Sequence, residues 1–234
     1  MNNKDGNYGG FLIAAMVGID MKSTMDMDTT IKGIPVNQDT IEKIFNEILS
    51  KDLNHNVIFK IKGIKNIHAV SDYDDFRVSI EAQFFTIKVN IKMDITTGDL
   101  IIPREVDYEF RLMFEDRKIE GKAYNLNTVL AEKIESIIAR NVSNTRARDF
   151  YDVYILLTLR KYDIDMDSLR EALKKKAEER NTLIYLEQCE KYLNDIDESK
   201  DILKIWNSYK EKYSYAEGIE FSDIMDVLKD ALGK

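Results

Sequence analysis

Hydrophobic and polar residues alternate with a period of two through much of the first half of the chain, between about residues 28 and 124. Alternation of this kind, rich in Ile, Val, Phe and Thr, is typical of strands that bury one face of a sheet. Residues 38–49 depart from it, because their apolar positions recur at helical spacing and predict a helix. The expected strands cover 29–34, 56–64, 76–85, 87–95 and 106–114, with a turn at 96–99.

From residue 125 to the end, the apolar positions follow helical spacing and no proline occurs. The sequence therefore predicts an α+β fold, with a mixed sheet domain over 1–124 and a helical domain over 125–234 packed on it. Lysines 174–176 are expected on a solvated helix face. The expected helices cover 125–140, 145–160, 167–180, 182–193, 199–213 and 222–232.

The composition excludes several classes of protein. With 234 residues, 44% hydrophobic and 32% charged, the chain can form a real core and is neither disordered nor collagen-like. The apolar run 9–19 is well short of the roughly 20 residues that span a bilayer, so we read it as a buried helix and expect no membrane association. The net charge of −8 argues against coating nucleic acid by bulk charge, and the single cysteine favours the reducing cytoplasm.

Two aspartates lie close together at the start of the first expected strand. Asp26 and Asp28 share one face of an extended segment, about 6.6 Å apart along the strand. Their mutual repulsion raises one pKa or recruits a cation, and Mg²⁺ binds through one or two carboxylates together with substrate phosphates. A simple strand start or turn explains the same pattern, so both interpretations stay open.

Two further features give this acid pair a context. Gly9 and Gly10 open the apolar helix, and backbone N–H groups at a helix N-terminus suit a triphosphate. Lys92 and Asp94 share a face of a later strand, from which a third carboxylate could meet the first two. Three such carboxylates can hold two Mg²⁺ ions, with Asp94 assisting deprotonation of the attacking hydroxyl. An exposed strand face is the alternative.

A third group of charged residues lies on the expected helices. Glu132 and Lys133 fall off the apolar stripe of their helix, and the next helix begins with the residues 146–152, RARDFYD. Arg148 and Asp152 are one turn apart and can form an ion pair that stabilises the helix by about 0.2–0.5 kcal/mol. The same residues can equally present charge to a nucleotide.

Taken in order, these motifs resemble those of the AbiEii/AbiGii toxin family, nucleotidyltransferases of the DNA polymerase β type. The resemblance runs from Gly9 to about Leu157, and it is the combination that is specific. It implies a nucleotidyltransferase-like sheet followed by a helical bundle. The matching pieces are Gly9-Gly10, KSTMDMD at 22–28, KMD at 92–94, LAEK at 130–133 and RARDFYD at 146–152.

The resemblance implies a role for each matching residue. It assigns nucleotide binding to Gly9, Gly10, Thr24, Lys133 and Arg148. It assigns two Mg²⁺ ions to Asp26, Asp28 and Asp94, and catalysis to Lys92, Asp94 and Asp152. Glu132, Asp149 and Tyr151 would support the site.

The activity implied by the resemblance is Mg²⁺-dependent transfer of a nucleotidyl group from an NTP to an RNA acceptor, tRNA included. Family members are toxins of toxin–antitoxin or phage-defence (abortive infection) systems, each with a separately encoded antitoxin. Two departures leave alternatives open: Arg148 stands where the family has Lys, and only a polar octapeptide precedes Gly9, where the fold needs a strand. Another segment or subunit would then complete the sheet. Alternatively, the chain is a catalytically impaired module that binds nucleotide or a partner, or it modifies a small molecule.

Overall fold

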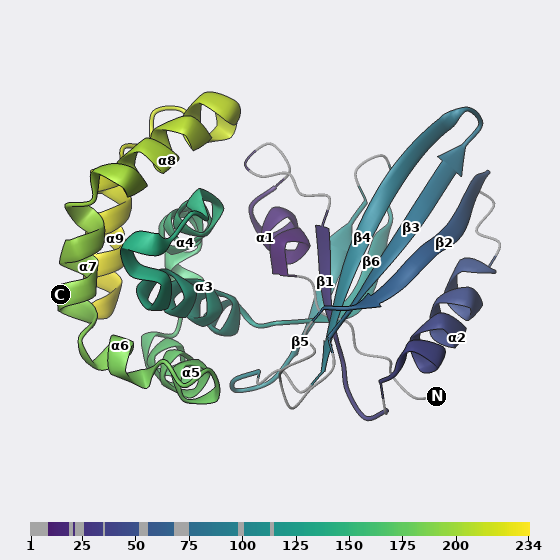
Figure 1. Ribbon diagram of the computed structural model, residues 1–234, viewed down its shortest axis with the longest axis horizontal. Coiled ribbons are helices and arrows are strands. Elements are labelled where there is room, and N and C mark those ends of the chain that lie inside the picture. Colours follow the sequence, from purple (N-terminus) through teal and green to yellow (C-terminus); the bar gives the residue numbers. More distant parts are fainter. Residues whose placement is uncertain are drawn as a thin grey trace. The chain divides into compact units, whose positions relative to one another are not determined.

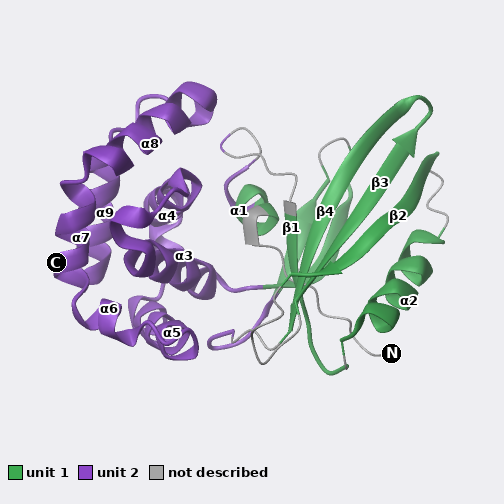
Figure 2. Ribbon diagram, viewed as in Figure 1, with its two compact units in different colours: residues 1–15, 23–99, 107–123 green, residues 16–22, 100–106, 124–234 purple. Residues whose placement is uncertain are grey.

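The computed structural model describes the chain except for residues 1–8, 19–20, 22–25, 35, 52–55, 68–74, 98–100 and 113–114. Contacts within the chain divide it into two compact units (Figure 2). Unit 1 comprises residues 1–15, 23–99 and 107–123, and unit 2 comprises residues 16–22, 100–106 and 124–234. That the helical domain packs on the sheet domain stays a prediction.

Unit 1 is built on a mixed sheet of four strands in the order β1-β4-β3-β2 (Figure 1). β1 runs parallel to β4, whereas β3 is antiparallel to both β4 and β2. The parallel pair places the start of β1 beside the middle of β4, which is where the candidate site lies. The bounds are β1 Asp26–Ile31, β2 Val57–Asn66, β3 Phe76–Phe84 and β4 Ile87–Thr97.

Helix α2, Gln38–Leu49, packs on one face of this sheet. Asn37 caps the helix, because its side-chain oxygen accepts a hydrogen bond from Thr40 N at 2.9 Å. Ile41 and Phe45 bury their side chains against the alternate, inward-facing residues of the strands, and each fully buried side chain of this kind contributes about 1.5–3 kcal/mol. The buried strand residues of this core are Phe76, Val78, Ile80 and Ile95.

The other face of the sheet is polar, because the side chains of a strand alternate between its two faces. It carries the even-numbered residues of β1 and β4 and the odd-numbered residues of β3. Thr30 and Thr96 share a hydrogen bond of 2.7 Å on this face. The predicted turn at 96–99 is therefore wrong at its first two residues, because pairing with β1 keeps residues 96 and 97 in β4. The other two residues lie outside the described residues.

Unit 1 also contains most of helix α1, Gly9–Val17, and nearly all of a two-stranded sheet of β5, Val106–Arg111, and β6, Lys118–Ala123. The prediction of a helix in the apolar run is confirmed, and Leu12 and Ile13 are fully buried. The ring of Phe11 stacks on that of Phe110, with 5.7 Å between the centroids. The pattern did not predict β6, whose KIEGKA sequence places its three charged residues on one face but contains only one strong strand former, Ile119.

Unit 2 is helical and is organised around α3, which buries most of its residues. The expected helix over 182–193 is wrong in its continuity, because the backbone leaves helical geometry at Gln188 (φ −104°, ψ 23°) and a new helix begins. The helices are α3 Leu126–Arg140, α4 Ala147–Leu159, α5 Met166–Glu179, α6 Leu183–Glu187, α7 Cys189–Asp197, α8 Lys200–Lys212 and α9 Phe221–Leu232, with short 3₁₀ turns at Asn141–Ser143, Lys161–Asp163 and Ser214–Ala216.

The start of α3 is fixed by Asn125, which acts as its N-cap. The side-chain oxygen of Asn125 accepts a hydrogen bond from Thr128 N at 2.9 Å. Its amide group donates to the carbonyl oxygens of Ile102 and Arg104, both at 2.8 Å. One buried residue thus caps the helix and holds the segment 100–106 against it.

Within the described part of the chain, no helix combines the length and the hydrophobicity that crossing a membrane requires.

Candidate active site

The pairing of β1 with β4 brings the predicted acidic residues of the sheet together. Asp28 lies opposite Asp94, and Asp26 lies opposite Lys92, in neighbouring parallel strands. Paired residues point to the same face, and neighbouring strands are about 4.8 Å apart. Asp28 is exposed and Asp94 is half-buried, so solvent reaches this row of carboxylates. The side chain of Asp26 lies outside the described residues.

Arg77, on β3, contacts Asp94 from the other side. Its Nε donates to one carboxylate oxygen of Asp94 at 2.6 Å, and its Nη2 donates to the other at 2.7 Å. Arg77 and Asp94 are direct cross-strand partners. Asp28, Asp94 and Arg77 therefore form one row across β1, β4 and β3, which we call the acidic row. In it, the guanidinium of Arg77 offsets part of the negative charge.

Carboxylate oxygens of this kind are the ligands that Mg²⁺ prefers, so the row suits a divalent cation in the chemistry of its donors. Among the described side chains, no group of three His, Cys, Asp or Glu residues lies close enough to hold a metal ion. Gly9 and Gly10 form the start of α1, whose first N–H groups have no partner within the helix. Thr24 lies outside the described residues.

The helical motifs form a second cluster, within unit 2. Lys133, on α3, lies between two carboxylates of α4: its Nζ is 2.7 Å from Asp149 and 3.2 Å from Asp152. Arg146 also contacts Asp149, with 2.8 Å between Nε and a carboxylate oxygen. Both aspartate side chains are completely buried, and that of Lys133 is 14% exposed. This cluster joins α3 to α4 by charge.

The electrostatics of this cluster keep Lys133 charged. Burial on its own would lower the pKa of Lys133, but the carboxylates of Asp152 and Asp149 outweigh burial and raise it above its ordinary value. A lysine held in this way is a permanent cation. It links the two helices, and a small part of its surface stays exposed to solvent.

The structure places the remaining helical site residues around this cluster. Glu132 points away from it, because its carboxylate is 3.0 Å from the buried ammonium of Lys176 on α5. Arg148 is exposed in the first turn of α4. Tyr151 is fully buried, and its hydroxyl donates to the carbonyl oxygen of Met21.

An aromatic group packs beside Tyr151. The ring of Tyr215 lies 4.9 Å from that of Tyr151, and the hydroxyls of Tyr209 and Tyr215 are 3.0 Å apart. Burial is the largest cause that raises the pKa of all three phenols, which stay neutral at physiological pH. The cluster is thus bounded by neutral aromatic groups.

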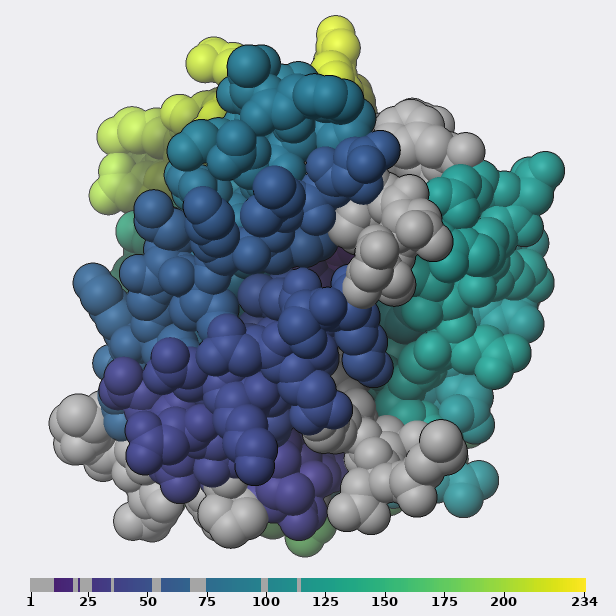
Figure 3. Space-filling view, turned by 90° about the vertical axis from the view of Figure 1, so that its right-hand side faces the viewer, coloured from purple at the N-terminus to yellow at the C-terminus, as the bar shows by residue number. Residues whose placement is uncertain are grey.

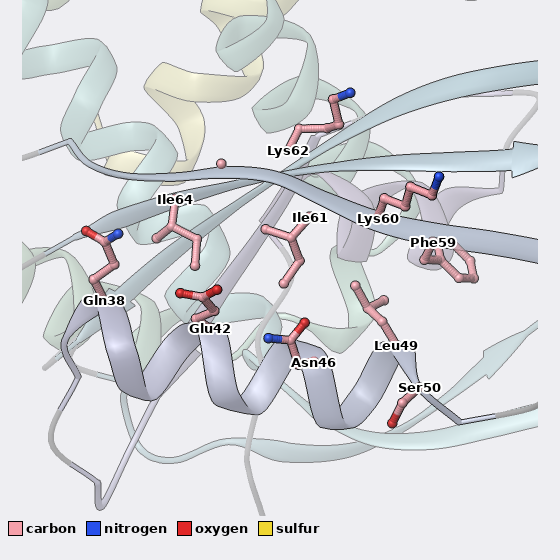
Figure 4. A pocket seen from close by; sticks show the side chains of 11 residues that line it. Gln38, Glu42, Asn46, Leu49, Ser50, Phe59, Lys60, Ile61, Lys62 and Ile64 are labelled. Atoms are coloured by element: carbon pink, nitrogen blue, oxygen red, sulfur yellow. The ribbon is translucent and has the colours of Figure 1, made fainter.

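A groove of about 700 Å³ lies between α2 and the strand β2 at the edge of the sheet (Figure 4). Ile61 and Ile64 point toward α2, whereas Lys62 points away from it (Figure 4). α2 and β2 lie at the surface in the space-filling view (Figure 3). The groove is on the α2 side of the sheet, and its lining includes neither Asp28 nor Asp94.

Sequence reasoning missed Arg77, Arg146 and Lys176, which pair with predicted or neighbouring acidic residues. The expectation that Lys176 is solvated is wrong, because its side chain is 1% exposed. Arg146 lies within the quoted RARDFYD motif, three residues before Asp149, and this spacing could have identified it. Arg77 carries no such local pattern, since its contact depends on the register of two strands.

A family model described as "Nucleotidyl transferase AbiEii toxin, Type IV TA system" matches residues 8–227. Solved structures with a similar fold include JHP933 from Helicobacter pylori, with 13% sequence identity and a TM-score of 0.51, covering 99% of this chain and 85% of that one. A candidate nucleotidyltransferase from H. pylori has 13% identity and a TM-score of 0.52, covering 99% of this chain and 88% of that one. No curated protein matches the chain. The family match spans both clusters, and the chain is therefore a nucleotidyltransferase of the AbiEii toxin family of type IV toxin–antitoxin systems.

Proposed function

We propose that this toxin transfers a nucleotidyl group from an NTP to an RNA acceptor, with tRNA among the acceptors, in a reaction that depends on Mg²⁺. The observation that carries the proposal is the register of β1 and β4, which sets Asp28 beside Asp94 on a solvent-accessible polar face. Its family membership supports the reaction class. A separately encoded antitoxin would be its partner in the cell.

The residues that would hold the divalent ions are Asp26, Asp28 and Asp94. Two bound ions supply Lewis acid stabilisation of the attacking and leaving oxygens in this class of reaction. Asp94 would assist removal of the proton from the acceptor hydroxyl, and Lys92 would add positive charge on the same face. Asp28 and Asp94 lie on paired strands of a packed sheet, so their backbone positions are set before the substrate binds.

The nucleotide would be bound by groups of both motif sets. Backbone N–H groups at Gly9 and Gly10 suit phosphate oxygens, because the N-terminus of a helix carries partial positive charge. Thr24, Lys133 and Arg148 would contribute further contacts. Lys133 and Arg148 would provide positive charge for the phosphates, and Asp152, which pairs with Lys133, would take part in catalysis. Asp149, Glu132 and Tyr151 would keep the start of α4 and its neighbours in place.

The test is transfer of label from each α-³²P-NTP, with Mg²⁺, to total RNA, purified tRNA and small hydroxyl or amine acceptors. We expect label in RNA, and loss of at least about 100-fold in Asp94→Asn, comparable to the loss of one transition-state contact. Label in RNA that persists in Asp94→Asn would contradict the assignment of the acidic row.

The alternatives are separated by the same experiment. Label that enters only a small acceptor would assign the chain to small-molecule modification. NTP binding measured by calorimetry, with no transfer to any acceptor, would assign it to a binding module. In both cases the proposal of RNA modification would be withdrawn.

A further inference from the structure

The guanidinium of Arg77 is the part of the acidic row to which the proposed function gives no role. It engages both carboxylate oxygens of Asp94, at 2.6 and 2.7 Å, in the parallel two-bond geometry that makes arginine pairs strong. Arg77 comes from β3 and is the direct cross-strand partner of Asp94. The contact is therefore set by the register of the sheet.

We propose that Arg77 is a positioning residue that holds Asp94 in a cation-free arrangement and lowers the affinity of the site for a divalent cation. The inference rests on the proposed function, in which Asp94 is a metal ligand. Arg77 would then set the concentration of free metal at which the toxin becomes competent. That is a form of regulation built into the sheet.

Charge is the first argument for this direction of effect. Asp28 and Asp94 lie side by side on neighbouring strands, and like charges at this spacing repel each other. Arg77 offsets that repulsion in the absence of a metal. A divalent cation at Asp94 would lie next to a guanidinium, which repels it, so binding would be weaker than at the same carboxylates without Arg77.

Competition for oxygen atoms is the second argument. Both oxygens of Asp94 accept a hydrogen bond from Arg77, whereas a hard cation also needs carboxylate oxygen as its ligand. The cation must either share an oxygen that is already hydrogen-bonded or displace one N–H group. The opposite effect, tighter binding, would follow if the hydrogen bonds of Arg77 only oriented Asp94 as a ligand.

The contact can also open without unfolding of the sheet. The side chain of Arg77 is 43% exposed and that of Asp94 is 25% exposed, so water can replace the hydrogen bonds. The buried carboxylates of Asp149 and Asp152 have no comparable access. Arg77 therefore suits exchange with a soluble cation.

The experiment measures Mn²⁺ binding to the full chain by the electron paramagnetic resonance signal of free Mn²⁺, with no nucleotide or RNA present. We expect Arg77→Ala to lower the dissociation constant about tenfold, the effect of about 1.4 kcal/mol. Arg77→Lys keeps the charge but loses the two-bond geometry. Its dissociation constant for Mn²⁺ should lie between those of the parent protein and Arg77→Ala. Unchanged or weaker Mn²⁺ binding in Arg77→Ala would overturn the proposal.

The matched control is Lys88→Ala, which removes a positive charge from the same face of the same strand. Lys88 is six positions from Asp94, about 20 Å along an extended strand, and its ammonium is 3.4 Å from Glu81. Its Mn²⁺ affinity should stay within about twofold of the parent protein, because charges at this distance are screened. An equal gain in Lys88→Ala would reduce the effect to net charge and overturn the role of Arg77.

A double-mutant cycle separates this inference from the proposed function. In an Asp94→Asn background, Arg77→Ala should change Mn²⁺ affinity by less than about twofold, because the shared partner is absent. If Asp94→Asn binds Mn²⁺ as tightly as the parent, the metal assignment in the proposed function fails. If Asp94→Asn weakens binding but Arg77→Ala does not strengthen it, only the role of Arg77 fails.

Discussion

The two charged clusters differ in how much water reaches them. In the sheet, Asp94 and Arg77 are 25% and 43% exposed, whereas the side chains of Asp149 and Asp152 in the helical cluster are fully buried. Breaking a buried ion pair leaves an uncompensated charge in the interior, while an exposed pair exchanges its partner for water at small cost. The same residue types thus form a solvent-accessible pair in the sheet, where we propose exchange with a cation, and a buried cluster that holds helices together in the helical unit.

The largest stability effect is expected at Lys133. Lys133→Met removes the cation between two buried carboxylates, so we expect a loss of about 3–5 kcal/mol in the free energy of unfolding. Urea unfolding followed by circular dichroism measures it. Lys174→Met, at an exposed position of α5, is the control and should stay within about 0.5 kcal/mol. A loss below 1 kcal/mol in Lys133→Met would remove the distinction between the clusters.

A smaller loss is expected at Lys176, which is 1% exposed but has carboxylate partners that reach water. Glu132 and Glu179 are 23% and 36% exposed, at 3.0 and 3.2 Å from the ammonium. In Lys176→Met these carboxylates can turn to solvent, so we expect a loss of about 1–3 kcal/mol by the same unfolding measurement. A loss equal to that of Lys133→Met would show that burial of the cation alone decides the cost.

The sheet pair should contribute little to stability. Arg77→Ala is expected to change the free energy of unfolding by at most about 1 kcal/mol, because both side chains are partly exposed. The measurement is made without divalent metal, so that cation binding does not contribute. A loss above 3 kcal/mol would place this pair in the same class as the helical cluster.

The smallest effect is expected in how the free energy of unfolding decreases at alkaline pH, and it concerns the phenols beside the helical cluster. Burial and the hydrogen bond with Tyr215 raise the pKa of Tyr209, so above about pH 10 the unfolded chain loses this proton before the folded chain does. Stability is present below that pH and falls as pH rises, by up to about 1.4 kcal/mol per pH unit for one group. Tyr209→Phe should show a shallower fall between pH 10 and 11. An unchanged slope would contradict the burial of this phenol.

The part of the fold that could be predicted from the sequence is the part that depends on local periodicity. Alternation identified the four strands of the main sheet, although β1 runs over Asp26–Ile31 and not over 29–34, and helical spacing identified α2. Burial of one face gives each of these elements a periodic sequence, whichever residues of its neighbours it contacts. The strand β6 escaped detection, since its KIEGKA sequence consists mostly of Lys, Glu, Gly and Ala, which are uncommon in strands. Local pattern therefore determined element type, with errors where the residues present do not favour the element that forms.

The candidate site could be predicted only in part. Asp26, Asp28 and Asp94 came from short motifs, and the register of β1 with β4 sets Asp28 opposite Asp94. Arg77 could not be found, because its contact with Asp94 depends on which residues of β3 and β4 face each other. The burial of Lys176 was missed because a run of lysines is typical of a solvated helix face. In the fold, α3 packs against α5, and the side chain of Lys176 is buried.

The central claim is that the acidic row of the sheet carries the chemistry. Label transfer to RNA by Asp28→Asn, compared with Asp39→Asn, tests it most directly, because each change removes one exposed carboxylate and Asp39 belongs to α2 on the other side of the sheet. We predict a loss of at least about 100-fold in Asp28→Asn, with Asp39→Asn within about twofold of the parent protein. Equal activity of the two variants, at equal folded fractions, would contradict the account.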